Sequence, residues 1–198
     1  MTNFNFPETD RLAQLRSEIA MQAARLIAEE GCEYSTAKRR AAKQVLGNQK
    51  INGNVLPDNQ QIEQEVREYH ALFCADTQPQ RLRELRLIAI EVMEKLSQFN
   101  PYLIGAAMNG TAGEHSDIYL HLYTENAKDL AIFLLNLGID FEVSEHGNRR
   151  GEASETLSFM FKREAVHLMV HDFDDLKHTD RNERADLNAV KQLLAESE

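Results

Sequence analysis

The spacing of the apolar residues changes near Pro101, and this change constrains the fold more than any other feature of the chain. Before Pro101, apolar residues recur every three or four positions, which is the period of amphipathic helices. After it, short apolar runs and alternating stretches have the length and period of strands. We therefore expect an α+β protein, with an N-terminal helical region packed on a mixed sheet that is flanked by helices.

Two helices are predicted at the start of the chain. The first covers residues 9 to 30 and ends at Gly31, because an apolar stripe runs through it and glycine favours a helix end. The second begins with Ser35 as its N-cap and ends before Gly47. This second helix would carry the main basic cluster of the chain.

A third helix is predicted from Asp58 and Gln61, which are spaced as in a capping box. Its apolar stripe would consist of Ile62, Val66, Tyr69 and Phe73. Residues 76 to 79 then interrupt the helical pattern, so we place a boundary there. It separates a helical region over residues 1–77 from a second domain over residues 78–198.

Strands and helices are interleaved in the second domain. We predict helices over residues 82–99, 127–137 and 184–194, and strands over residues 102–108, 117–123, 140–144, 156–162 and 165–171. A polar turn that includes Arg149 and Arg150 would join the third and fourth strands. In the strand over residues 117–123, Ile118, Leu120 and Leu122 alternate with polar positions, so one face would be core and the other open to chemistry.

The net charge and the cysteine content limit the molecules that this protein is expected to bind and the compartment in which it is expected to work. The net charge of −10 argues against general adhesion to nucleic acid or to anionic membranes. Two cysteines without a C-x-x-C pair indicate reduced thiols, and no stretch resembles a secretory signal or a membrane span. We therefore expect a cytoplasmic protein with no membrane association. A Walker A loop, the G-x-S-x-G and H-E-x-x-H motifs and a dinucleotide fingerprint do not occur in the sequence, which argues against those enzyme classes.

The most informative motif runs from residue 108 to 122, as strand, glycine-rich turn, and a strand that opens with Asp117. Glycines in such a turn let backbone amides approach an anion closely. The candidate phosphate-binding residues are Gly110, Thr111, Gly113 and Ser116. Asp117 is the candidate catalytic residue and metal ligand. A plain tight turn, with Asp117 capping the local backbone, is the structural alternative.

The order of elements from Arg81 onward resembles the nucleotidyltransferase fold of the DNA polymerase β superfamily. In that family a Gly-Ser or Gly-Gly turn follows the first strand, two carboxylates open the second strand, and a later strand brings a third. Gly110-Thr111 corresponds to the turn and Ser116-Asp117-Ile118 to the start of the carboxylate strand, within a match over residues 80–172. The run from Gly110 to Ile118 is also similar to one in uncharacterised bacterial proteins.

The departures from this family matter for function. Tyr119 stands where the second carboxylate belongs, and His167 replaces the third. One carboxylate cannot hold two hard cations, so the resemblance implies a catalytically degenerate member. A remaining metal would be divalent, Mg²⁺ or Mn²⁺ in preference to Zn²⁺, and Asp117, His121 and His167 would be its ligands, with His171 on the same face.

These expectations lead to three hypotheses. The first is a module that binds a nucleotide or RNA phosphate at the turn from Gly110 to Asp117. The second is an active metal-dependent nucleotidyltransferase with Asp117 as its main metal ligand. The third is a self-associating scaffold without a nucleotide ligand, and a homo-oligomer stays open in all three. The candidate nucleic-acid contacts are Lys38, Arg39, Arg40 and Lys43, although a solvated helix face is the simpler interpretation of that cluster.

Overall fold

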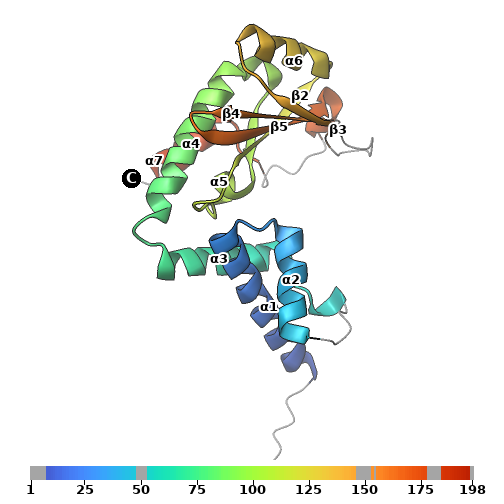
Figure 1. The fold of residues 1–198 in the computed structure, drawn as a ribbon, viewed down its shortest axis with the longest axis vertical. Coiled ribbons are helices and arrows are strands. Elements are labelled where there is room, and N and C mark those ends of the chain that lie inside the picture. The colour runs from blue at the N-terminus through green and yellow to red at the C-terminus, as the bar shows by residue number, and fades with distance from the viewer. Residues whose placement is uncertain (1–7, 48–52, 146–152, 154, 178–183, 197–198) are drawn as a thin grey trace, which may run out of the picture. The chain divides into compact units, whose positions relative to one another are not determined.

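The structure is a computed structural model, and it describes residues 8–47, 53–145, 153, 155–177 and 184–196. These residues form two compact units (Figure 1). The helical unit consists of residues 1–78 with Gly113–His115, and the sheet unit consists of Pro79–Ala112 with Ser116–Glu198. The fold is α+β, as the change in apolar spacing predicts.

The helical unit contains α1 (Glu8–Glu30), α2 (Tyr34–Leu46), a 3-10 turn (Gly53–Val55) and α3 (Asn59–Phe73). Its core is made of small and branched residues from all three helices, among them Ile19, Ala23, Ala37, Ala41, Ile62 and Val66. The prediction for α1 is confirmed, since the helix ends where Gly31 takes a φ of +65°. The capping box is also confirmed, because Gln61 N donates to Asp58 Oδ1 at 2.8 Å.

Two details of the helical prediction are wrong. α2 begins at Tyr34 with Glu33 in the N-cap position, so Ser35 lies inside the first turn and does not cap the helix. Phe73 is 70% exposed, and the buried polar residue His70 lies on the inner side of α3 instead. The aromatic Phe73 ring contacts Tyr69 at 4.7 Å on the outer side of the helix.

The sheet unit alternates helices with strands over most of its length. Its elements are α4 (Gln78–Lys95), a 3-10 turn (Ser97–Phe99), β1 (Tyr102–Ile104), α5 (Gly105–Asn109), β2 (Ile118–Thr124), α6 (Ala127–Asn136), β3 (Glu142–Glu145), β4 (Glu155–Phe161), β5 (Glu164–Asp172), a 3-10 turn (Phe173–Lys177) and α7 (Leu187–Ala195). The predicted strand over residues 102–108 is wrong in its second half. Gly105 turns the chain at a φ of +68°, and the small residues that follow form α5. Arg149 and Arg150 lie outside the described residues.

The five strands form one mixed sheet in the order β1-β2-β5-β4-β3. β2 and β5 are parallel neighbours at its centre, and the other pairs are antiparallel. One face of the sheet is the core: Leu120 of β2 and Leu168 of β5 pack with Leu85, Val92 and Met93 of α4, Leu130 of α6 and Val190 of α7. The opposite face carries the polar positions of β2, β4 and β5 and is described next. None of the helices in the described parts of the chain combines the length and the apolar composition that a membrane span needs.

Candidate functional site

The strand register brings three side chains from three strands into one row. Tyr119 of β2 pairs with His167 of β5, and His167 pairs with Ser158 of β4. Paired residues on neighbouring strands lie on the same face of a sheet, so the three side chains stand together on the polar face. Asp117 comes two residues before Tyr119 and therefore shares that face.

A chain of hydrogen bonds joins Asp117, His167 and Ser158. His167 Nε2 lies 3.2 Å from Asp117 Oδ2, and His167 Nδ1 lies 2.8 Å from Ser158 Oγ. With its proton on Nε2, the neutral ring donates to Asp117 and accepts from the serine hydroxyl. Because both ring nitrogens are held, the orientation of the imidazole is fixed. The His167 side chain is 22% exposed and that of Asp117 is 42% exposed, so solvent and ligands can reach both.

Of the three residues in this hydrogen-bonded series, Ser158 is the one that the sequence interpretation missed. It lies between the buried Leu157 and Phe159, so its polarity inside an apolar strand was the available signal. The alternation of apolar and polar residues along the strand indicates the face on which Ser158 lies. Which residue of the next strand lies beside Ser158 depends on the register between the two strands. That register is a tertiary property, and sequence spacing alone does not supply it.

Tyr119 covers the other side of His167. The two rings are stacked, with centroids 4.6 Å apart and planes inclined by 22°. Tyr119 is 39% exposed, an unusual exposure for a large aromatic residue in the middle of a sheet. An aromatic platform thus stands on the polar face of the sheet next to Asp117 and His167.

A pocket of about 420 Å³ adjoins this row of residues. It is lined by Asp140, Phe141, Glu142, Ser158, Phe159, Met160, Ala165 and His167. The lining is mostly apolar with two carboxylates, and among the residues that the structure describes no lysine or arginine lines it. Such a pocket favours an uncharged or cationic group over an anion.

His121 and His171 form a pair of histidines on the same face. Their ring centroids are 4.3 Å apart, and the Tyr123 ring stacks on His171 at 5.4 Å. Burial, together with the smaller effects of the neighbouring His171 and Arg184, lowers the pKa of His121 to about 4. Burial also lowers the pKa of His171. Both rings are therefore neutral at pH 7.

The predicted metal ligands are thus divided between two pairs. Asp117 and His167 are hydrogen-bonded to each other, whereas His121 lies against His171. Within the described residues, no three or more His, Cys, Asp or Glu side chains are grouped so that they could hold one metal ion.

The backbone amides of the glycine turn donate hydrogen bonds to acceptors within the protein. Gly110, at a φ of +86°, closes α5 and donates to Ala106 O at 3.0 Å, and Ala112 N donates to the same oxygen at 3.1 Å. Thr111 is buried, and its N and Oγ1 both donate to Asn109 Oδ1, at 3.0 and 2.7 Å. The amides of Gly110, Thr111 and Ala112 are therefore not presented to an anion.

The other two predicted phosphate-binding residues belong to different units. Gly113 is part of the helical unit, and Ser116 is part of the sheet unit. The Ser116 carbonyl accepts a 3.5 Å hydrogen bond from Arg81 Nη2, and Arg81 forms a bidentate ion pair with Glu164 at 2.7 Å. This pairing with Glu164 neutralises the positive charge of Arg81 next to the turn.

The basic cluster of α2 is partly engaged within the helical unit. Arg40 donates to Glu30 Oε2 at 2.7 Å, and Lys38 donates to Asn59 Oδ1 at 3.2 Å. Arg39 and Lys43 are exposed on the same helix. Half of the predicted nucleic-acid contacts therefore have structural roles in this unit.

Comparisons with known protein families, with curated proteins and with solved structures found no match.

Proposed function

We propose that this protein is a catalytically degenerate nucleotidyltransferase-fold protein of the cytoplasm that binds a nucleotide by its base and sugar. The proposed site is the sheet surface made of Asp117, Tyr119, Ser158 and His167. The observation that carries the proposal is the stacked and exposed Tyr119 ring in the place of a metal-binding carboxylate.

The side chains of this surface suit the parts of a nucleoside. The π face of every base can stack on an aromatic ring, and such stacking contributes about 1–3 kcal/mol per base. The hydrogen-bonded chain fixes the orientation of His167, on which the Tyr119 ring stacks, so little side-chain entropy is lost from His167 on binding. The partly exposed Asp117 carboxylate accepts hydrogen bonds, which suits a sugar hydroxyl or a base N–H group.

The electrostatics favour the nucleoside part over a triphosphate. Asp117, Asp140 and Glu142 surround the platform and the adjacent pocket, and Arg81, which donates to the Ser116 carbonyl next to Asp117, is paired with Glu164. A highly charged polyphosphate without a metal ion would be repelled there. We therefore propose that the ligand contacts Tyr119, and not the glycine turn that the sequence favours.

The first test is equilibrium binding of the four ribonucleoside monophosphates, the matching triphosphates and a short single-stranded RNA, measured by calorimetry with chelator and with Mg²⁺. We expect monophosphate binding in chelator. Tyr119→Ala should weaken it by about 10- to 100-fold, as the loss of one stacked base implies, and Tyr119→Phe should retain it. Phe173→Ala, which removes another exposed aromatic side chain of the same unit, is the matched control.

Three results would contradict the proposal. One is the absence of binding by every nucleotide and by the RNA, and another is equal binding by the wild type and Tyr119→Ala. The third is binding that needs Mg²⁺ and is abolished by Asp117→Asn, because that result would favour an active metal-dependent nucleotidyltransferase.

A further inference from the structure

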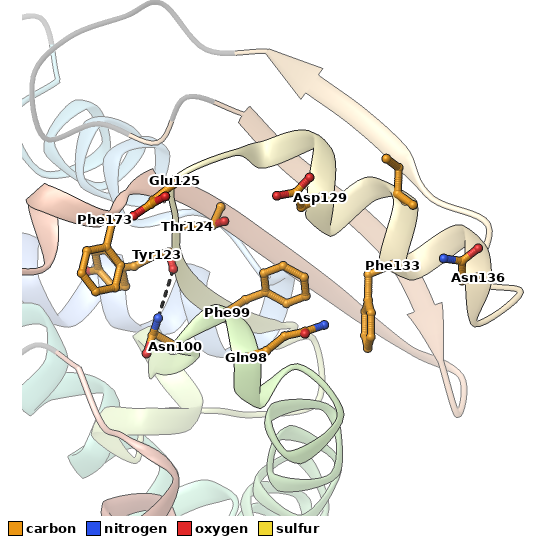
Figure 2. A pocket seen from close by; sticks show the side chains of 11 residues that line it. Gln98, Phe99, Asn100, Tyr123, Thr124, Glu125, Asp129, Phe133, Asn136 and Phe173 are labelled. Carbon is orange, nitrogen blue, oxygen red and sulfur yellow. Dashed lines mark hydrogen bonds between the residues drawn. The ribbon is translucent and has the colours of Figure 1, made fainter.

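A groove of about 550 Å³ lies in the sheet unit at the end of β2, away from the row of Tyr119, His167 and Ser158. Figure 2 shows the side chains that line it, which come from the 3-10 turn before β1, the end of β2, α6 and the turn after β5. They are Gln98, Phe99, Asn100, Tyr123, Thr124, Glu125, Asp129, Ile132, Phe133, Asn136 and Phe173.

The floor of the groove is aromatic and aliphatic. Phe99 and Phe133 meet edge to face, with centroids 5.4 Å apart and an interplanar angle of 70°. Ile132 is 56% exposed and Phe173 is 43% exposed, so both offer apolar surface to a ligand. The exposed apolar surface continues along α6 to Leu135, which does not line the groove. A continuous apolar surface of this kind marks an interaction site that is longer than a small molecule.

Within the described residues, the charges that line the groove are negative. They are Glu125 and Asp129, and the described part of the lining contains no lysine or arginine. Asp129 is held in place, because Asn126 Nδ2 donates to its Oδ1 at 3.1 Å while the Asn126 side chain caps α6 through Lys128 N. Carboxylates beside an apolar floor attract a cation that carries hydrocarbon, and they repel phosphates of nucleic acid or lipid.

Three side-chain amides complete the lining: Gln98, Asn100 and Asn136. Figure 2 shows Asn100 on the side of the groove, where its Nδ2 donates to Tyr123 O at 3.3 Å. Amide side chains offer both donors and acceptors, which match the N–H and C=O groups of a peptide backbone. The lining therefore combines the features that an extended or helical peptide segment requires.

We propose that this groove binds a segment of a partner protein in which bulky apolar residues stand next to lysine or arginine. Apolar side chains of the segment cover Phe99, Phe133, Ile132 and Phe173. Its basic side chains pair with Glu125 and Asp129, and these pairs supply the specificity for a basic partner. This site is separate from the proposed nucleotide surface, and neither proposal depends on the other.

The test uses the full chain and fluorescently labelled synthetic peptides. The first peptide carries leucine and phenylalanine between lysines, the second has glutamate in place of lysine, and the third has serine in place of the apolar residues. Fluorescence anisotropy should detect binding of the first peptide, with affinities at least about tenfold weaker for the other two, a difference set by charge and apolar contact. Added salt should weaken the first interaction.

Variants connect the binding to the groove. Glu125→Gln should reduce the preference for the lysine peptide over the glutamate peptide severalfold. Ile132→Ser should weaken binding of the lysine peptide. Neither change should unfold the protein, since both residues are exposed. Glu142→Gln, an exposed carboxylate on β3, is the matched control and should have no effect. Thermal unfolding of each variant separates loss of binding from loss of fold.

Equal binding of the lysine and glutamate peptides, or the absence of binding by all three, would overturn the proposal. So would unchanged affinity in both Glu125→Gln and Ile132→Ser. Sedimentation of the wild type adds a further check. A concentration-dependent dimer that Ile132→Ser abolishes would mean that a second copy of this chain occupies the groove. That result would also overturn the proposal of a basic partner protein.

Discussion

The histidines on the polar sheet face lie in two kinds of surroundings. His167 is held by Asp117 and Ser158, and its side chain reaches solvent. His121 and His171 lie against the Tyr123 ring, and His121 Nδ1 and His171 Nε2 are buried without a hydrogen-bond partner among the described residues. His167 is therefore suited to ligand contact, whereas the burial of His121 and His171 makes the stability of the protein depend on pH.

The direction in which the free energy of unfolding changes with pH follows from the lowered pKa of His121. Its pKa is about 4 in the folded protein against 6.5 in the unfolded chain, so the unfolded state alone takes up the proton between these values. The free energy of unfolding should therefore fall by roughly 3 kcal/mol as the pH drops from about 6.5 to about 4. The lowered pKa of His171 acts in the same direction.

Urea unfolding between pH 7 and pH 4 measures this effect. In His121→Phe the slope of stability against pH should be shallower than in the wild type, because one proton-binding group of the unfolded chain has gone. Leu87→Ala removes no proton-binding group at a half-exposed position and should leave the slope as it is. Parallel curves for the wild type and His121→Phe would contradict the assignment.

Helices and strands differ in how well the sequence predicted them. α1, α3 and α6 follow from local signals, namely apolar period, capping side chains and a glycine at the end. β1 and α5 do not, because an apolar run of seven residues suits either element and one backbone angle at Gly105 divides it. The row of Tyr119, His167 and Ser158 depends on register across three strands, so only its two members on the predicted polar faces could be found in advance.

The N-cap of α3 gives a prediction at the same scale. Asp58→Ala removes the acceptor of the Gln61 amide and breaks the capping box, so the helical unit should lose about 1 kcal/mol of stability. Denaturant unfolding followed by circular dichroism measures the loss. Gln60→Ala, an exposed change in the first turn of the same helix, should cost much less. Equal losses in the two variants would mean that the cap contributes nothing to this helix.

At the scale of the whole molecule, the described residues form two hydrophobic cores that have no described residue in common. One consists of α1, α2 and α3, and the other joins the sheet to α4, α6 and α7. Each core has its own buried centre, so each unit carries its own source of stability. A local change in one core should therefore act on that unit first.

Leu120→Ala tests this division. Leu120 is fully buried in the sheet, and such a truncation costs about 2–5 kcal/mol through lost contacts and the remaining cavity. Hydrogen exchange should show reduced protection of amides in β2 and β5 and unchanged protection in α1 and α3. Leu87→Ala, at a half-exposed position on α4, is the control. Equal loss of protection in both units would show that they unfold together.

β3 ends the sheet beyond β4 and is four residues long, and the exposed carboxylate of Glu142 stands at its first position. A short terminal strand that carries a negative charge is a poor template for a strand from another molecule, because it offers few backbone hydrogen bonds and repels an acidic incoming chain. This edge of the sheet is therefore less prone to β-linked self-association than a long apolar edge strand would be.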